Sequence, residues 1–354
     1  ERQITAWMAS AFGFPADASG LLVTGASQAN LVGVLVARAH ALGLAVRSEG
    51  LAQRPRLTAY ASVEAHGCVA KALDIAGLGS DQLRRLPTGE DGGLLLEALS
   101  AAIARDRAAG LMPFLVVGSA GTVNTGAFDD LAGLAGICAA EGLWFHVDGA
   151  FGALAAFSPR LKPRLAGLER ADSVAFDFHK WAHVPYDAGF VLVRDAAAHR
   201  ATFANPLDYL SREPAGLAAG ETWPCDLGPD LSRGFRALKV WVTLQTLGTD
   251  ALGAAMEANC EAAAHLARRI AASGRFELAA PVGLNIVCFG IKGDADGALA
   301  RRLVIALHES GRAAPSMTQR GGRAVVRAAI FNHRTTITDI DAFVADLEAT
   351  LAAI

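Results

Sequence analysis

The sequence predicts an α/β fold, with a mainly parallel sheet covered by helices on both faces and a smaller α+β unit after it. Short apolar runs typical of buried strands occur at residues 20–23, 57–61, 114–117, 143–147, 173–176 and 190–193. Amphipathic segments typical of helices lie between most of them, at 68–76, 94–109 and 129–141. Alternation of this kind builds parallel sheets. At 354 residues the chain is also long for one compact core.

The remaining segments follow in order. A helix is predicted at the start, because Ile4, Met8 and Phe12 recur at helical spacing before Gly13. A second helix is expected over 28–42. After about residue 241 the pattern changes to a long helix at 251–273, strands at 276–278, 284–289 and 325–331, and helices at 298–309 and 338–351. We therefore expect a large domain over 1–245 and a small α+β domain over 246–354. The Pro- and Gly-rich loop at 203–231 has a length typical of lids or disordered segments.

Composition excludes several classes of function. The net charge is -3, from 35 acidic and 32 basic residues, and no basic block stands out, so no nucleic acid is expected as a partner. No apolar stretch is long enough to span a bilayer and no signal-peptide pattern opens the chain, so no membrane is expected either. The five cysteines form no C-x-x-C pair. This spacing favours neither a zinc site nor a disulfide framework, and we expect reduced thiols in a cytoplasmic protein.

A small-residue turn, Thr24-Gly25-Ala26-Ser27, joins the first strand to the second helix. Small residues let the backbone approach an anion, and a helix N-terminus offers free N–H groups and the positive end of a dipole. We interpret Ala26 and Ser27 as a candidate phosphate site. An ordinary helix N-cap would give the same pattern.

Two charged residues follow two other strands. Asp148 comes directly after 143–147, where an unpaired carboxylate is costly to bury and a protonated pyridine nitrogen would pair with it. A helix cap or a metal ligand are the alternatives, although no second ligand cluster accompanies it. Lys180 ends the segment Asp177-Phe178-His179-Lys180 after the strand at 173–176. A partly desolvated lysine becomes a nucleophilic amine, whereas a solvated strand end is the alternative.

Taken together, these features indicate a ligand more specifically than any one of them does. His66 also lies between a strand and a helix, where an imidazole could stack on an aromatic cofactor or be merely structural. Ligands gather at the carboxyl ends of the strands in open parallel sheets. An anion cradle, a carboxylate for a ring nitrogen and a lysine for a Schiff base are the set that pyridoxal 5'-phosphate (PLP) requires. PLP is therefore the predicted cofactor, and no metal is expected.

At these positions the chain resembles the group II PLP-dependent amino-acid decarboxylases, which include the aromatic-L-amino-acid and glutamate decarboxylases. The matching stretches are TGASQANLVGVLVAR, AHGCVAKALDIAGLG, GTVNTGAFDDL, GLWFHVDGAFG, ADSVAFDFHKW, LSRGFRALKVW and, near the C-terminus, AVVRAAIFNHR. The resemblance implies the type I PLP-dependent fold, as in aspartate aminotransferase. It also implies a homodimer with active sites completed by the neighbouring subunit, and an amino acid as substrate, with aromatic side chains favoured over acidic ones.

The resemblance also implies a role for each site residue. Lys180 would carry the cofactor as a Schiff base, Asp148 would bind the pyridine nitrogen, and His66 and Ala150 would face the two sides of the ring. Thr122 would lie near the ring substituents. The residues expected near the phosphate are Ala26, Ser27, Asp177 and His179. Catalysis is assigned to Lys180, His66 and Asp148.

The chain departs from that family's pattern in three respects. Asp177-Phe178 stands where Asn-Pro is usual, which puts the role of a carboxylate near the phosphate in question. The family's N-terminal helical segment has no counterpart in the printed residues. The family's loop tyrosine is expected near residues 223–225, where there is none, so Tyr209, His66 and Cys225 are the candidate proton donors. We expect decarboxylation to an amine and carbon dioxide. Oxidative deamination to an aldehyde and a non-catalytic PLP-binding homologue are the alternatives.

Overall fold

The computed structural model describes residues 1–205, 212–216, 219–220 and 222–354. Its larger part is built on a seven-stranded sheet. In spatial order the strands are β1 (Ser19–Val23), β7 (Gly189–Val193), β6 (Ser173–Asp177), β5 (Trp144–Asp148), β4 (Met112–Ser119), β2 (Leu57–Ser62) and β3 (Leu83–Leu86). Neighbours from β6 to β3 are parallel, whereas β7 runs antiparallel to both β6 and β1. The parallel strands therefore end at one common edge.

Helices cover both faces of this sheet. One face is packed against α2 (Ala26–Leu42), α4 (Cys68–Ile75) and α7 (Ala196–Phe203), and the other against α1 (Arg2–Phe12), α5 (Leu96–Ala108) and α6 (Leu131–Glu141). Side chains alternate between the two cores, so that on β5 Trp144 joins one core while Phe145 and Val147 join the other. Burial on both faces explains why the strands are continuous apolar runs. A short helix, α3 (Val46–Glu49), follows α2.

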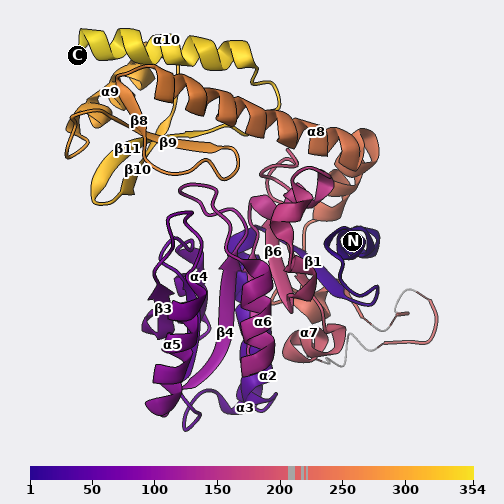
Figure 1. Ribbon diagram of the computed structural model, residues 1–354. Coiled ribbons are helices and arrows are strands. Elements are labelled where there is room, and N and C mark those ends of the chain that lie inside the picture. The colour runs from indigo at the N-terminus through magenta and orange to yellow at the C-terminus, as the bar shows by residue number, and fades with distance from the viewer. Residues whose placement is uncertain (206–211, 217–218, 221) are drawn as a thin grey trace.

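The C-terminal unit contains a four-stranded antiparallel sheet. Its order is β10 (Ser316–Arg320), β11 (Arg323–Ala329), β9 (Ile286–Ile291) and β8 (Phe276–Leu278). One face packs on α9 (Ala298–Ser310), α10 (Ile337–Ala353) and the second half of α8 (Arg236–Ala272). Figure 1 shows α8 running from the large unit into this C-terminal unit, which lies over the carboxyl edge of the large sheet.

The expected fold class, a mainly parallel sheet with helices on both faces and an α+β unit after it, is confirmed. The long helix begins earlier than predicted, at Arg236, because Gly248 with φ 74° and ψ 165° interrupts its pattern. The predicted domain boundary at 245/246 lies inside α8, close to this interruption. Two edge strands, β3 and β10, were not predicted. None of the helices in the described part of the chain is long and apolar enough to cross a membrane.

Candidate active site

A cavity of about 610 Å³ lies where the carboxyl edge of the large sheet faces the C-terminal sheet. Its walls come from the turns that follow β1, β2, β4, β5 and β6, and from β9, β11 and the residues beside them. All of the predicted site residues line it: Ala26, Ser27, His66, Thr122, Asp148, Ala150, Asp177, His179 and Lys180. The topology explains why these residues lie together, because each of them is the last residue of a strand or lies shortly after one.

Lys180 presents its amine to this cavity. Its side chain is 37% exposed, and Nζ lies 3.0 Å from Oδ2 of Asp177. Asp177 is buried, and its other oxygen accepts the N–H of Ala26 at 2.6 Å. Asp177 therefore connects the lysine to the first turn of α2. The sequence left open how the carboxylate of Asp177 could lie near the expected phosphate. The ammonium of Lys180 and the N–H of Ala26 both contact this carboxylate, so its negative charge does not face the phosphate unpaired.

His179 lies on the same side of the cavity. Its Nδ1 accepts the N–H of Ala188 at 2.9 Å, and its Nε2 lies 3.6 Å from Asp177. Burial lowers the pKa of His179, although the charge of Asp177 opposes this effect. The ring of Tyr186 lies against His179 at a tilt of 31°, with centroids 4.2 Å apart. Tyr186 could not be identified from the sequence, since no strand end or motif marks it.

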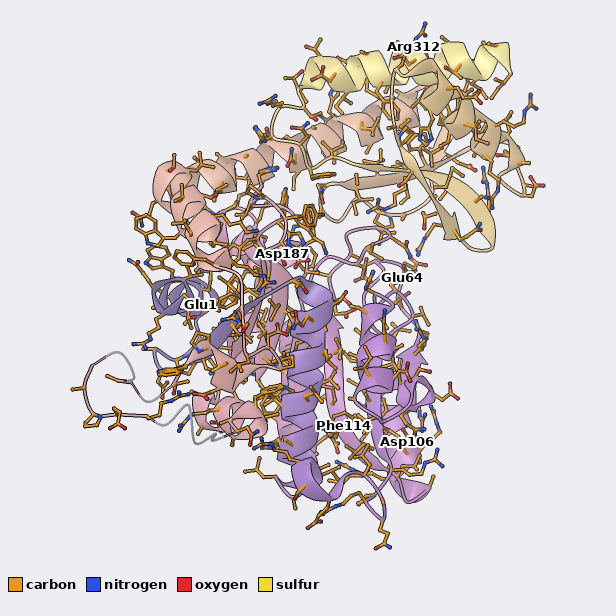
Figure 2. The ribbon with its side chains drawn as sticks, turned by 180° about the vertical axis from the view of Figure 1, so that it is seen from behind. Glu1, Glu64, Asp106, Phe114, Asp187 and Arg312 are labelled. Carbon is orange, nitrogen blue, oxygen red and sulfur yellow. The ribbon has the colours of Figure 1, made fainter. Side chains whose placement is uncertain are left out.

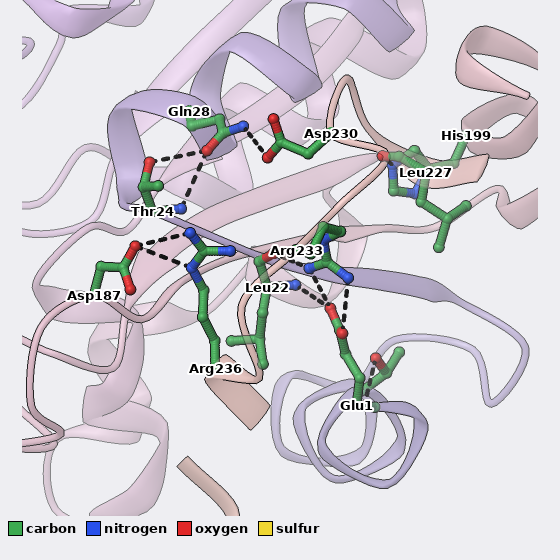
Figure 3. A network of polar contacts seen from close by, with 11 residues as sticks. Glu1, Leu22, Thr24, Gln28, Asp187, His199, Leu227, Asp230, Arg233 and Arg236 are labelled. Carbon is green, nitrogen blue, oxygen red and sulfur yellow. Dashed lines mark hydrogen bonds and ion pairs between the residues drawn. The ribbon is translucent and has the colours of Figure 1, made fainter. Parts of the chain in front are cut away.

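The candidate phosphate turn is held from outside by the chain that precedes α8. Oε1 of Gln28 accepts the backbone N–H of Thr24 at 3.1 Å and its hydroxyl at 2.9 Å, while Nε2 donates to Asp230 at 3.1 Å. Figure 3 shows this group beside the ion pair of Arg236 with Asp187. The turn between β1 and α2 is therefore fixed on both sides, by Asp177 within the cavity and by Asp230 outside it.

Asp148 lies at the base of the cavity and is 7% exposed. Oδ1 accepts the N–H of Ala150 at 3.1 Å, and Oδ2 lies 3.8 Å from the thiol of Cys68. Burial raises the pKa of Asp148, and burial together with this carboxylate raises the pKa of Cys68 to about 12. Within the described ranges, Asp148 forms no ion pair. A buried carboxylate with so few donors is suited to a cationic ligand.

A row of buried polar side chains lies behind Asp148 on the same face of β5. Nδ2 of Asn30 donates to the carbonyl of Ala26 at 2.8 Å, so Oδ1 of Asn30 must face Nε2 of His146, 2.9 Å away. That contact requires the His146 proton on Nε2. Nδ1 of His146 then accepts from the hydroxyl of Ser173 at 2.7 Å, and Ser173 accepts from Nε1 of Trp144 at 2.8 Å.

This row is neutral and closely packed. Burial lowers the pKa of His146 to about 3. A Cβ atom on Gly33 would lie 2.7 Å from the His146 ring, so the helix can approach the strand only with glycine at that position. None of these residues lines the cavity, and no motif in the sequence marks them as part of the site.

His66, which follows β2, and Thr122, which follows β4, also line the cavity. Nδ1 of His66 accepts the N–H of Cys68 at 3.1 Å, which leaves its proton on Nε2 in the neutral ring. The hydroxyl of Thr122 accepts the N–H of Ala127 at 3.1 Å. Cys225 lies in a 3₁₀ turn and is not among the described residues that line the cavity, and Tyr209 lies outside the described residues.

The C-terminal unit supplies a mainly apolar wall, formed by Leu284, Ile286, Ala329 and Phe331, which also includes Asn285. Arg327 lines the same wall, but its guanidinium donates to the carbonyls of Val123 at 2.7 Å and Asn124 at 3.2 Å. No feature of the sequence predicted this wall. Within the described residues, no group of three or more His, Cys, Asp or Glu side chains is placed to hold a metal ion.

An accessible amine, an unpaired buried carboxylate and a helix N-terminus around one cavity fit PLP, and together with the fold they define a PLP-dependent enzyme of the type I class. A family model described as the pyridoxal-dependent decarboxylase conserved domain matches residues 1–292. The chain belongs to this family. Membership confirms the expected family, the cofactor PLP and the expected enzyme class, a PLP-dependent amino-acid decarboxylase.

Individual relatives and structures agree with this membership. The chain is 34% identical over 340 residues to an aromatic-L-amino-acid decarboxylase of Bacillus atrophaeus, with 94% of this chain and 69% of that protein covered. It is 33% identical over 339 residues to a 3,4-dihydroxyphenylacetaldehyde synthase of Drosophila melanogaster, with 94% and 65% covered. A crystal structure of Oryza sativa TDC with PLP and tryptamine matches with a TM-score of 0.92 at 28% identity, over 100% of this chain and 75% of that one. The chain thus spans about two thirds of the length of these two curated relatives.

Proposed function

We propose that this protein decarboxylates an aromatic L-amino acid to the corresponding amine and carbon dioxide. The observation that supports the proposal most strongly is that Lys180 and the unpaired buried Asp148 share one cavity whose outer wall is mainly apolar. When bound, PLP supplies an aldehyde that condenses with amines and a ring that accepts the electrons of a bond broken at Cα.

The residues of the chain hold and orient these partners. Lys180 would provide the amine for the covalent link to the cofactor, with Asp177 3.0 Å away to orient it. Asp148 would pair with the ring nitrogen and keep it protonated. His66 and Ala150 would flank the ring, and Thr122 would lie near its substituents. Ala26, Ser27 and His179 would surround the phosphate, which the N-terminus of α2 would stabilise.

The preference for an aromatic substrate comes from the C-terminal wall. Leu284, Ile286 and Phe331 offer apolar surface on which an aromatic ring would be desolvated. An acidic side chain would require a cation, and Arg327 already binds two backbone carbonyls. A panel of amino acids, assayed for carbon dioxide release, tests this choice. Faster turnover of glutamate or aspartate than of tryptophan, tyrosine and phenylalanine would contradict it.

The second candidate is oxidative deamination to an aldehyde, which the resemblance to an aldehyde synthase supports. The two reactions differ in what happens at Cα after carbon dioxide leaves: a proton is added to give the amine, or dioxygen oxidises this carbon to give the aldehyde, ammonia and hydrogen peroxide. His66 is the candidate donor among the described cavity residues, with its proton on Nε2. Incubation in air with an accepted amino acid, followed by quantification of amine, aldehyde, ammonia and hydrogen peroxide, separates the reactions. Aldehyde and peroxide in equal amounts, with little amine, would favour the second.

We also propose a homodimer. Between residues 235 and 247, five large apolar side chains are 40–75% exposed: Phe235, Leu238, Trp241, Val242 and Leu247. Several exposed apolar side chains on one short segment are typical of an interface. Sedimentation of the PLP-loaded protein tests the proposal, and a fully active monomer would contradict it. The expected cytoplasmic location stays a prediction.

A further inference from the structure

An ion pair joins the C-terminal unit to the loop that carries His66. Arg320 ends β10, and its Nη1 lies 2.6 Å from Oε1 of Glu64. Glu64 stands two residues before His66, in the turn between β2 and α4. Figure 2 shows Glu64 at the edge of the large unit that faces the C-terminal unit. This pair therefore spans the two units directly beside the cavity.

A second contact extends the pair to the loop after β4. Oε2 of Glu64 accepts from Nδ2 of Asn124 at 3.0 Å, and Oδ1 of Asn124 accepts from the hydroxyl of Thr318 at 2.9 Å. Asn124 stands two residues after Thr122, which lines the cavity. Both carboxylate oxygens of Glu64 are thus bonded, and the loops of His66 and Thr122 are tied to each other and to the β10–β11 hairpin.

The surroundings make this contact stronger than an ordinary surface ion pair. The side chain of Glu64 is 14% exposed and that of Arg320 is 24% exposed. Reduced exposure limits screening by water and salt, and the amide of Asn124 adds a further donor to the carboxylate. Removal of one partner would leave the other charged, poorly solvated and unpaired, which disfavours the closed arrangement of the His66 loop.

We propose that Glu64 and Arg320 are positioning residues whose ion pair holds the His66 loop against the bound PLP. The inference rests on the proposed function, because it takes His66 as a cofactor contact. Neither Glu64 nor Arg320 touches the reacting atoms; they act through the loop. The loop of Thr122 is held independently, since Arg327 donates to two of its backbone carbonyls. Loss of the pair lets the His66 loop sample positions away from the ring, so the affinity for PLP falls and the fraction of correctly arranged enzyme falls with it.

The experiment compares Glu64→Gln, Arg320→Ala, their double variant and the conservative Arg320→Lys with the parent protein. A matched control is Glu277→Gln, because Glu277 pairs at 2.6 Å with Arg323 on β11, an arginine side chain that is likewise 24% exposed. Thermal melting first establishes that each variant is folded. The dissociation constant for PLP is then measured by titrating the apo protein and following visible absorbance, and kcat and KM are measured with an accepted amino acid.

We expect Glu64→Gln and Arg320→Ala each to raise the dissociation constant for PLP about tenfold. The double variant should be no worse than either single variant, since both remove the same interaction. Arg320→Lys should recover most of the affinity, and Glu277→Gln should stay within about twofold of the parent.

Some results would overturn the inference. Folded Glu64 and Arg320 variants that bind PLP as tightly as the parent would do so, as would additive effects in the double variant. An equal effect of Glu277→Gln would show a general loss of stability in place of positioning. A parent protein that takes up no PLP would overturn the proposed function itself and this inference with it, whereas normal uptake by the parent and all variants overturns the positioning role alone.

Discussion

Replacement of Asp148 by asparagine should change stability and activity in opposite directions. The carboxylate is 7% exposed and accepts one backbone N–H, from Ala150 at 3.1 Å. Burial raises its pKa, which means that the folded apo protein disfavours the ionised form. An asparagine of the same shape keeps the acceptor for Ala150 and removes the charge, while it gives up the weaker contacts of the carboxylate with the Cys68 thiol and the Asn30 side chain. The apo variant should therefore melt at a higher temperature than the apo parent at neutral pH.

The same change should cripple catalysis. A neutral amide cannot hold the ring nitrogen of PLP protonated, and loss of a preorganised charge partner typically costs about a hundredfold or more in kcat, equivalent to about 2.7 kcal/mol. The assays are thermal melting of both apo proteins at several pH values, and turnover with saturating PLP. The stability advantage should be largest at neutral pH and shrink in acid, because there Asp148 of the folded parent is itself protonated and its penalty disappears.

Asp129 provides a control at the same edge of the sheet. Burial raises its pKa to about 6, but its two oxygens each accept a backbone N–H at 2.7 Å, from Leu94 and Ser119. Asparagine can accept only one of these, so Asp129→Asn should lower the melting temperature. The reasoning fails if Asp148→Asn also lowers the melting temperature of the apo protein, or if its activity stays within a few-fold of the parent.

The remaining predictions concern the lysine, the phosphate turn and a buried histidine. Lys180→Ala should abolish turnover and the visible absorbance of lysine-bound PLP; a variant with the parent spectrum would falsify the assignment. Ser27→Asp should weaken PLP binding at least about tenfold, because it places a negative charge at the N-terminus of α2, and unchanged affinity in a cofactor titration would move the phosphate elsewhere. His199 has a pKa lowered to about 4 by burial, so the stability it contributes is present above pH 6.5 and is lost as the pH falls toward 4. His199→Gln should reduce the pH slope of the unfolding free energy in that window by about 1.4 kcal/mol per pH unit, measured with urea, and an unchanged slope would exclude a neutral buried histidine.

Most of the large sheet could be predicted, because strands buried on both faces are continuous apolar runs. The strand β3, with the sequence Leu-Arg-Arg-Leu, and the strand β10, with Ser-Met-Thr-Gln-Arg, lie at sheet edges and carry polar side chains, so no apolar run marks them. The start of α8 at Arg236 was missed because its first half carries exposed as well as buried apolar side chains, which blurs the helical pattern, and because Gly248 divides the helix.

The nine predicted site residues could be identified because each lies at or just after the end of a strand of the large sheet, where a parallel sheet places its ligands, whereas Tyr186 and the C-terminal wall could not. The residues that support the predicted ones could not be identified either. Glu64 and Arg320 are 256 positions apart, and no local pattern links them. Asn30 and His146 are likewise far apart in sequence, and both read as ordinary helix and strand residues. Tyr209 remains a prediction, since it lies outside the described residues.

The direction of the hydrogen bonds behind Asp148 has a consequence for how the enzyme responds to acidity. Every proton from Trp144 through Ser173 and His146 to Asn30 has one possible place, and a pKa of about 3 keeps the imidazole neutral. The row behind Asp148 thus keeps one charge and one arrangement of protons from mildly acidic to alkaline solution. Any bell-shaped dependence of the rate on pH must then report Asp148 itself, groups at the front of the cavity or the substrate, and not the side chains behind Asp148.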